Sequence, residues 1–311
     1  MRNAPAIAVG PASVEPVEAA IRAGGGRIAA RREAEAIVWL DPSDPQGLKD
    51  MLDDSPASWV QLPFAGIETF FDAGVITSEK TWTCTKGAYG KATAEHALAL
   101  VLAAARHLHE HLRATSWRPG FGMLGAPERQ LKDTTVLVVG TGGIGSALVT
   151  MLHPLGPRVL AVNRSGRSLD GAERTLSSDR LGELLPESDF VVIAASLTSS
   201  TRRLFDETAL AAMKPSAWLV NVARGGLVDT ADLVAALGAG TIGGAALDVT
   251  DPEPLPDDHP LWAMPNCIIT PHVANTADMA LPELVAMIER NVAHYVRGEP
   301  LEALVDVSLG Y

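Results

Sequence analysis

Three side chains suited to acid–base chemistry on a carboxylic acid each follow an apolar run. They are Arg224, Glu253 and His272. The planar fork of an arginine can hold a carboxylate through two parallel hydrogen bonds. A histidine gives or accepts a proton near neutral pH, and a neighbouring glutamate orients it and stabilises its charged form. The three residues therefore predict proton transfer to a substrate that carries a carboxylate.

For each of these residues, a purely structural role is the alternative interpretation. Arg224 alone is consistent with a side chain that caps carbonyls at a sheet edge. Glu253 lies between two prolines and is consistent with a solvated turn acid, and His272 follows a proline and is consistent with a loop histidine. Because all three follow apolar runs of strand type, we favour a shared site.

A glycine-rich turn indicates a dinucleotide. Residues 136–145 read V-L-V-V-G-T-G-G-I-G, which is a buried strand followed by the spacing G-x-G-x-x-G. Gly140 permits a tight turn, Gly142 lets the backbone approach a pyrophosphate, and Gly145 lets the next helix pack closely. The predicted phosphate contacts are Gly140, Gly142, Gly143, Ile144 and Gly145, at the start of a helix. A glycine turn that binds nothing is the alternative.

The next turn indicates which dinucleotide binds. A second apolar run, residues 158–162, leads into Asn163, Arg164, Ser165 and Arg167. An acid at this place binds the ribose hydroxyls of NAD, whereas an arginine accommodates the 2′-phosphate of NADP. The acid is absent and arginines are present, so NADP(H) is favoured and NAD(H) stays possible. A purely solvated turn is the alternative.

Strands and helices alternate along the chain, as in parallel sheets. Residues 1–80 predict a small α/β unit with strands at 6–9, 36–40 and 59–62. Later strands are predicted at 136–139, 158–162, 190–195, 218–222, 244–249 and 267–270, and helices at 144–155, 205–213, 230–237 and 280–297. Right-handed crossovers place the carboxyl ends of such strands on one edge. We therefore expect Arg224, Glu253 and His272 to meet at that edge.

The turn after the predicted strand 59–62 is a second candidate for contacting substrate. Phe64, Ala65 and Gly66 lie where open α/β sheets bind ligands. Their backbone N–H groups could meet a carboxylate. An ordinary β–α loop is an equally good interpretation.

Residues 93–112 predict one long helix with apolar side chains on nearly every face. Such a helix must be covered all round, by another domain or another subunit. Its end carries His107, His109 and His111. We predict no metal there, on the interpretation that no neighbouring carboxylate or cysteine completes a site.

Composition narrows the class of protein. A chain of 311 residues predicts two domains. It has 25 Lys and Arg against 37 Asp and Glu, and the net charge of −12 argues against nucleic-acid or anionic-membrane partners. Two cysteines, Cys84 and Cys267, suggest a reducing compartment, and no run approaches membrane-spanning length. A cytoplasmic protein is expected.

The chain resembles the D-isomer-specific 2-hydroxy-acid dehydrogenases over nearly its whole length. The shared segments are A-E-H-A-L at 94–98, the glycine turn, T-S-S-T at 198–201, M-K-P at 213–215, N-V-A-R-G at 221–225, L-V-D at 227–229, D-V at 248–249, E-P-L at 253–255 and T-P-H at 270–272. The later segments, in order and spacing, are more specific than the glycines alone.

The resemblance implies an α/β fold of two doubly wound parallel-sheet domains. A Rossmann dinucleotide-binding domain, residues 93–274, is inserted into a smaller flavodoxin-like substrate domain, residues 1–92 and 275–311. It also implies a homodimer, with the long helix near its interface. The implied activity is reversible hydride transfer between a nicotinamide cofactor and C2 of a 2-keto acid.

Residue roles follow from the same resemblance. Arg224 binds the substrate carboxylate and keto oxygen, His272 is the acid/base, and Glu253 pairs with it. The cofactor contacts include Val222, Ala223 and Asp248, the last at the nicotinamide carboxamide. The substrate carboxylate also meets the backbone of Phe64, Ala65 and Gly66.

Two departures from the family pattern bear on specificity. Ser196 stands where the family often has a proline, which implies a less rigid cofactor-side loop. Asn163 and Arg164 replace the acid of NAD users, and members with such a turn are often glyoxylate or hydroxypyruvate reductases, so these are the expected substrates. Alternatives are a cofactor-gated binding protein like the C-terminal-binding co-repressors, and a phosphoglycerate-type dehydrogenase.

Overall fold

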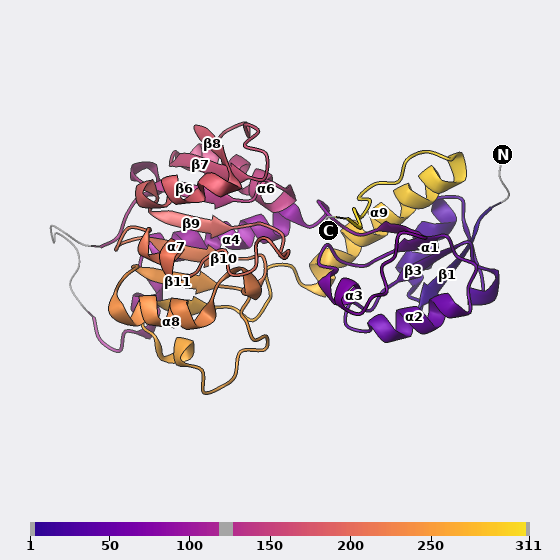
Figure 1. Cartoon of the computed structure of the whole chain (residues 1–311), viewed down its shortest axis with the longest axis horizontal. Coiled ribbons are helices and arrows are strands. Elements are labelled where there is room, and N and C mark those ends of the chain that lie inside the picture. The colour runs from indigo at the N-terminus through magenta and orange to yellow at the C-terminus, as the bar shows by residue number, and fades with distance from the viewer. Residues whose placement is uncertain (1–3, 118–126, 309–311) are drawn as a thin grey trace. The chain divides into compact units, whose positions relative to one another are not determined.

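The chain folds into two compact units. A computed structural model describes residues 4–117 and 127–308. Unit 1 comprises Met1–Tyr89 and Thr276–Tyr311, and unit 2 comprises Gly90–Asn275 (Figure 1).

Unit 1 is a five-stranded parallel sheet covered by helices on both faces. Its strands are β1 (Ala6–Gly10), β2 (Arg27–Ile28), β3 (Ala36–Trp39), β4 (Trp59–Gln61) and β5 (Thr81–Thr83), in the order β2-β1-β3-β4-β5. Its helices are α1 (Glu15–Ala23), α2 (Pro45–Asp53), α3 (Glu68–Asp72) and α9 (Ala277–Arg297). This strand order is that of flavodoxin-like folds.

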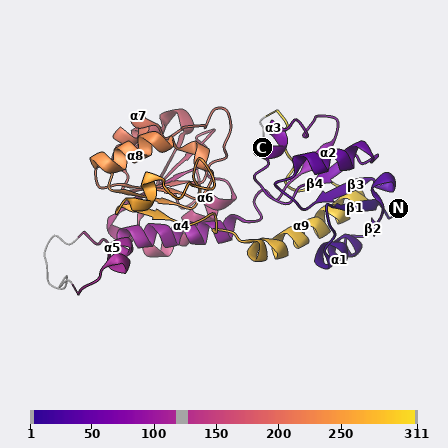
Figure 2. The same ribbon diagram turned by 90° about the horizontal axis from the view of Figure 1, so that it is seen from below.

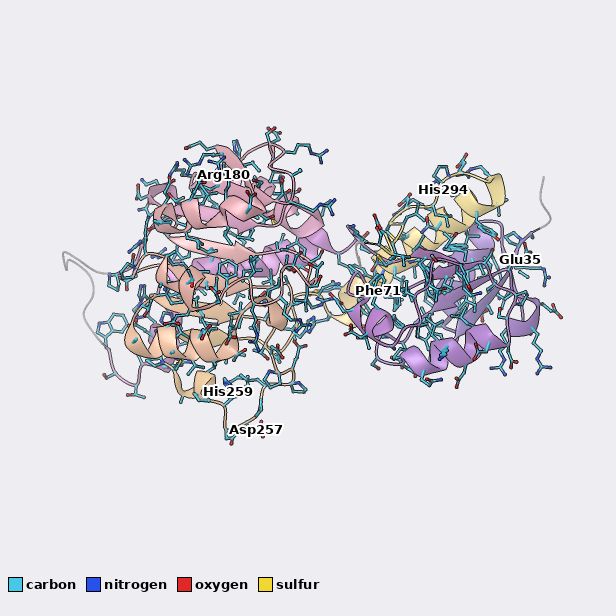
Figure 3. The ribbon with its side chains drawn as sticks, in the orientation of Figure 1. Glu35, Phe71, Arg180, Asp257, His259 and His294 are labelled. Carbon is cyan, nitrogen blue, oxygen red and sulfur yellow. The ribbon has the colours of Figure 1, made fainter. Side chains whose placement is uncertain are left out.

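Two apolar clusters hold unit 1 together, one on each face of the sheet. Helices α1 and α9 cover one face, where Ile21 and Ile288 pack with strand residues (Figure 2). Helices α2 and α3 cover the other face, where Phe70 is buried and Phe71 lies against the cluster (Figure 3). Strand residues are therefore buried on both sides, which explains their continuous apolar runs.

Unit 2 is a seven-stranded parallel sheet. Its strands are β6 (Thr135–Val139), β7 (Arg158–Asn163), β8 (Arg174–Ser177), β9 (Phe190–Ile193), β10 (Trp218–Asn221), β11 (Gly244–Leu247) and β12 (Cys267–Ile269). The order β12-β11-β10-β9-β6-β7-β8 is the Rossmann order with one added edge strand. Its strand order reverses between β6 and β9, beside the glycine turn.

Helices cover both faces of this second sheet. They are α4 (Gly90–Ala105), α5 (Leu108–Arg113), α6 (Gly143–Leu152), α7 (Glu207–Ala211) and α8 (Thr230–Ala239). Helices α4 and α6 pack on one face, and α7 and α8 lie on the other (Figure 2). No helix in the described ranges is long and apolar enough to cross a membrane.

The helix expected within residues 93–112 is present but is interrupted. Helix α4 ends at Ala105, and His107 adopts a left-handed backbone with φ of 49° before α5 begins. A residue in that conformation cannot continue a right-handed helix. Within this single chain Leu112 is 84% exposed, so the expected cover on this side would have to come from another subunit.

Candidate active site

The glycine turn after β6 has the geometry that a pyrophosphate requires. Gly140 has φ of +102°, and a Cβ there would lie 2.6 Å from the carbonyl of Ala194. A Cβ on Gly145 would lie 1.9 Å from the Gly140 carbonyl oxygen, so α6 packs directly on the turn. At Gly142, by contrast, the space that a Cβ would occupy is open to 4 Å among the described residues. The backbone is therefore approachable there.

Helix α6 begins in this open space. Gly142 is its N-cap residue, no side chain caps the helix, and its first turn contains no acid. The first N–H groups of a helix have no partner inside it and favour anions. The residues present thus fit a dinucleotide pyrophosphate at Gly142, Gly143 and Ile144.

The turn after β7 is held by the side chain of Asn163. Its Nδ2 donates to the carbonyl oxygen of Arg167 at 2.7 Å, and its Oδ1 accepts from the backbone N–H of Ser165 at 3.1 Å. An aspartate could not donate the first of these hydrogen bonds. The amide therefore fixes a turn in which Arg164 and Arg167 are both exposed.

Arg224 follows β10 at the carboxyl edge of the unit 2 sheet. Asn221 Nδ2 donates to the Arg224 carbonyl oxygen at 2.9 Å, and Arg224 Nη1 donates to the carbonyl oxygen of Ala223 at 2.7 Å. Ala223 and Val222 are buried beside it. The next residue, Gly225, is required because a Cβ there would lie 1.9 Å from the Thr250 carbonyl oxygen. This close approach brings the segments after β10 and β11 together.

His272 and Glu253 form a pair at the same edge. His272 Nδ1 and Glu253 Oε1 share a hydrogen bond of 2.5 Å. This hydrogen bond raises the pKa of His272 above its usual 6.5 and lowers the pKa of Glu253 below its usual 4.5. The charge of Arg224 contributes smaller effects at both groups. The three predicted residues therefore lie close enough for the charge of Arg224 to influence both His272 and Glu253.

Asp248 anchors the loop that carries His272. Its carboxylate accepts hydrogen bonds from Thr270 Oγ1 at 2.6 Å and from the backbone N–H groups of Val273 and Ala274 at 2.9 and 3.0 Å. Its backbone carbonyl oxygen accepts from the N–H of His272 at 2.8 Å. These bonds hold His272 at φ of 53°, a left-handed conformation that is costly for a residue other than glycine.

The charge of Asp248 is fixed by the same contacts. Burial alone would raise the pKa of this carboxyl, but hydrogen bonds from His96, Thr270, Val273 and Ala274 outweigh burial and lower the pKa to about 2. Asp248 is thus a buried, permanently ionised anchor.

His96 and Thr270 belong to this network, although the sequence interpretation gave them no role. His96 Nε2 lies 3.0 Å from Thr270 Oγ1 and 3.4 Å from Asp248 Oδ1. Both residues stand in segments that the chain shares with the family, His96 in A-E-H-A-L and Thr270 in T-P-H. What the sequence could not show is that α4 brings the first segment beside the second.

The hydroxyl group of Thr201 holds the loop that contains Ser196 through two hydrogen bonds. Thr201 Oγ1 donates to the Ser196 carbonyl oxygen and accepts from the Thr198 N–H, each at 2.8 Å. These bonds restrain the loop where the family often has a proline.

The candidate substrate loop lies in unit 1 between β4 and α3. Its first residue is held by two hydroxyl groups, since the Pro63 carbonyl oxygen accepts from Tyr89 Oη at 2.7 Å and from Thr85 Oγ1 at 3.1 Å. The Phe64 ring lies 5.7 Å from the Tyr89 ring. Among the hydrogen bonds of the described residues, none is donated by the backbone N–H of Phe64, Ala65 or Gly66. These groups are therefore suited to an external acceptor.

The histidines after α4 do have a carboxylate beside them, so the stated reason for excluding a metal is wrong. Glu110 lies with His107 and His109, and all three ligand atoms fall within 4.8 Å of one another. His111 instead pairs with Glu128 at 3.0 Å. The break between α4 and α5 at His107, which sequence periodicity did not reveal, allows His107 and His109 to lie beside Glu110.

Together, the Rossmann sheet with its glycine turn and the charged residues at the strand ends define a nicotinamide-dependent oxidoreductase. Residues 98–274 match the NAD-binding domain of the D-isomer specific 2-hydroxyacid dehydrogenases. The chain belongs to this family, so its reaction is hydride transfer between NAD(P)H and a 2-keto or 2-hydroxy acid.

Relatives of known activity and structure are similar over much of the chain. The human glyoxylate reductase/hydroxypyruvate reductase is 36% identical over 67% of this chain and 65% of its own length. A family member from Xanthobacter autotrophicus in complex with NADPH and MES has a TM-score of 0.85 at 27% identity, covering 99% of this chain and 100% of that one. The NADPH-dependent glyoxylate/hydroxypyruvate reductase of Sinorhizobium meliloti, in complex with NADP and sulfate, has a TM-score of 0.82 at 25% identity, with coverage of 99% and 100%.

Proposed function

We propose that the protein is an NADPH-preferring reductase of a small 2-keto acid such as glyoxylate or hydroxypyruvate. The single observation that carries this proposal is the His272–Glu253 hydrogen bond, at the sheet edge that also bears Arg224 and the glycine turn. An ionised glutamate keeps the imidazolium available as an acid at neutral pH.

The roles of the side chains follow from their chemistry. Arg224 holds the substrate carboxylate and polarises the carbonyl oxygen at C2. NADPH, when bound, supplies the hydride for C2. Protonated His272 gives its proton to that carbonyl oxygen, and Glu253 stabilises the charge of the imidazolium beforehand. Asp248 keeps His272 in place rather than exchanging protons, since its carboxyl stays ionised down to a pH of about 2.

The proposed preference for NADPH depends on the turn after β7. Arg164 and Arg167 are exposed there, and Asn163 replaces an acid that would repel a 2′-phosphate. The relatives from Xanthobacter autotrophicus and Sinorhizobium meliloti, which bind NADPH and NADP, support this assignment.

The proposed substrate carboxylate contact in unit 1 is the backbone of Phe64, Ala65 and Gly66. Its support is the set of N–H groups that donate no hydrogen bond among the described residues. The small 2-keto acids are supported by the printed activities of the human and Sinorhizobium meliloti relatives.

The proposal is tested by the oxidation of NADPH, and separately of NADH, with glyoxylate, hydroxypyruvate, pyruvate and phenylpyruvate. We expect turnover with glyoxylate or hydroxypyruvate, and a higher kcat/KM with NADPH than with NADH. Turnover confined to phenylpyruvate would contradict a small substrate. Dinucleotide binding without turnover on any keto acid would favour the cofactor-gated binding protein. Oxidation of NADPH or NADH with 3-phosphohydroxypyruvate, but with none of the four keto acids, would favour the phosphoglycerate-type enzyme.

We also propose a homodimer that covers the α4–α5 region. Leu102, Leu108, Leu112 and Trp117 are exposed there, and Trp117 is 93% exposed. Light scattering of the purified chain should give twice the monomer mass, and Leu112→Asp should reduce the measured mass toward that of the monomer. A monomeric wild-type chain would contradict this assignment.

A reducing, cytoplasmic compartment fits the cysteines. Cys84 and Cys267 are both free and buried. Burial raises the pKa of Cys84, and it raises the pKa of Cys267 to about 12. Both thiols are therefore protonated and shielded from oxidation.

A further inference from the structure

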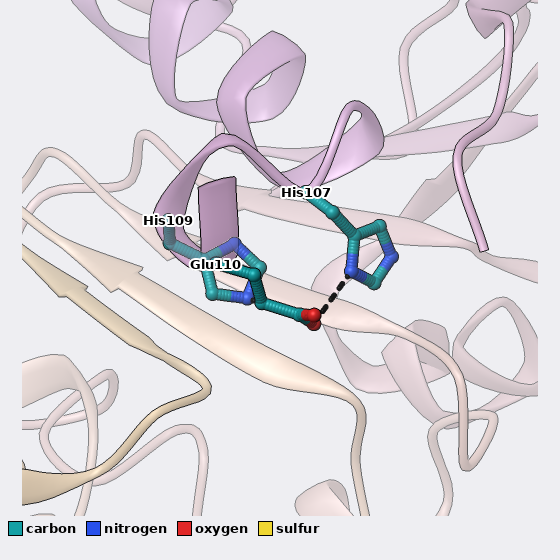
Figure 4. Close-up of side chains that lie close together, drawn as sticks. All are labelled: His107, His109 and Glu110. Carbon is teal, nitrogen blue, oxygen red and sulfur yellow. Dashed lines mark hydrogen bonds and ion pairs between the residues drawn. The ribbon is translucent and has the colours of Figure 1, made fainter. Parts of the chain in front are cut away.

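Three side chains that bind transition metals converge where α4 meets α5. His107 Nδ1 lies 2.9 Å from Glu110 Oε1, and His109 Nε2 lies 3.7 Å from the same oxygen. In Figure 4, the Glu110 side chain extends from beside the His109 ring toward the His107 ring. The cluster is formed entirely within unit 2.

This place is remote from the proposed reaction. The His109 ring packs on Trp218, the first residue of β10, at 4.8 Å. The glycine turn, Arg224 and His272 all follow the opposite, carboxyl ends of parallel strands. The cluster therefore lies at the amino edge of the same sheet and takes no part in the hydride transfer.

The spacing of the three ligand atoms suits a tetrahedral ion. At Zn–N and Zn–O distances of about 2.0–2.1 Å, ligand atoms at two corners of a tetrahedron lie about 3.3 Å apart. The separations of 2.9 and 3.7 Å bracket this distance, and no ligand atom is more than 4.8 Å from another. Small side-chain rotations would centre an ion among them.

His109 is the buried member of the cluster. Its side chain is 4% exposed, and its Nδ1 has no hydrogen-bond partner among the described residues. Its Nε2 lies 3.7 Å from Glu110 Oε1, which is too long for a hydrogen bond. A buried imidazole without a hydrogen bond is rare in a folded protein. An ion at Nε2 would give the ring a partner on the side of Glu110, while Nδ1 would stay without one among the described residues.

The backbone and the surroundings agree with such a site. His107 occupies a strained left-handed conformation, which is often found at functional sites. His107 also lines a cavity of about 360 Å³, which leaves room for a water ligand. Arg129 lines the same cavity, but Asp189 pairs with it at 3.1 Å and offsets its charge.

We propose that His107, His109 and Glu110 bind one divalent transition-metal ion of the zinc type, with water at the fourth position. Two imidazoles and one carboxylate are a ligand set that zinc uses in proteins. The ion joins the end of α4 to α5 and stabilises that turn.

Equilibrium dialysis of the tag-free full chain tests the site. The protein is stripped with a chelator, dialysed against micromolar ZnCl₂, and its zinc is counted by mass spectrometry. We expect saturation at one ion per chain, and Co²⁺ should show the visible absorption of a four-coordinate complex. His107→Ala and Glu110→Gln should each weaken binding by about tenfold or more. His111→Ala is the matched control, because His111 pairs with Glu128 outside the cluster.

Circular dichroism and turnover with NADPH show whether each variant is folded. We expect zinc to raise the melting temperature of the wild type and of His111→Ala, but not of Glu110→Gln. No saturable binding by folded wild-type protein would overturn the proposal. Equal zinc content in all variants would overturn it too, because the ion would then lie elsewhere. Loss of turnover on stripping the metal would contradict a site remote from the reaction.

Discussion

At the scale of single residues, we propose that one residue pair, His272 and Glu253, controls the proton that reaches the substrate. His272 and Glu253 share a 2.5 Å hydrogen bond, which raises the pKa of the imidazole and lowers that of the carboxyl. Both side chains are partly exposed, so solvent screens the interaction and its contribution to folding is small. In the proposed mechanism the pair matters because it sets the pH range in which His272 can act as an acid.

Removing the charge of Glu253 should move this range. In the proposed mechanism, reduction of a keto acid needs protonated His272, so we expect kcat/KM to fall as the pH rises through the pKa of His272. Glu253→Gln should lower that pKa and shift the alkaline limb of the profile to lower pH. Asp251→Asn, in the same turn, is the control and should leave the limb where it is. Identical limbs in wild type and Glu253→Gln would remove Glu253 from this role.

Arg164 should discriminate between the two cofactors. A charge-assisted hydrogen bond to a phosphate contributes about 1.5–3 kcal/mol, so Arg164→Ala should weaken NADPH roughly 10- to 100-fold. NADH, which has no 2′-phosphate, should bind almost unchanged. Cofactor fluorescence titrations measure both affinities. Arg180→Ala, an arginine paired with Glu183 in another segment, serves as the control. Equal weakening of both cofactors would contradict the phosphate assignment.

At the scale of elements, one buried carboxylate joins three segments. Asp248 follows β11, accepts hydrogen bonds from the loop after β12, and contacts His96 of α4. Because its side chain is 1% exposed and its pKa is lowered from 3.8 to about 2, ionisation stabilises the fold by about 2 kcal/mol. This stabilisation is present above the unfolded pKa near 4 and is lost as the pH falls through about 2.

Asp248→Asn should therefore destabilise unit 2 and displace His272. An amide in place of the carboxylate turns a donor toward N–H groups, which costs about 1–3 kcal/mol. Urea unfolding should show this loss at pH 6, and the difference from wild type should shrink as the pH approaches 2. The exposed Asp257→Asn is a surface control. A variant with wild-type stability and turnover at pH 6 would contradict the anchoring role.

The central elements could be predicted because their apolar runs are long and end in glycine or proline. The expected strands at residues 36–40, 218–222 and 267–270 correspond to β3, β10 and β12. The Rossmann and flavodoxin-like strand orders agree with the expected fold. The pairing of Glu253 with His272 was expected from the family resemblance, and the structure places the two in contact.

Other features could not be predicted because they depend on contacts distant in sequence. Strand β2 has two residues, and the edge strand β8 (Arg174–Ser177) is half-buried, so neither shows a clear apolar run. The break after α4 depends on the backbone of His107, in a sequence of good helix formers. The anchoring by His96 becomes visible only when α4 lies beside the loop after β12.

At the scale of the whole molecule, the candidate site residues belong to two units, each built on its own parallel sheet. Unit 2 carries the glycine turn and the candidate acid–base pair, and unit 1 carries the candidate substrate loop. We propose that His272 is the acid of a keto-acid reductase, so its removal should stop turnover while the dinucleotide still binds.

The most direct measurement is turnover of the best keto acid by His272→Ala, together with NADPH affinity by fluorescence. We predict that kcat falls by about 10²–10⁴-fold, because general acid catalysis is lost. We also expect a near-normal Kd for NADPH, since the glycine turn is untouched. Near-wild-type turnover in His272→Ala would show that His272 is not the acid.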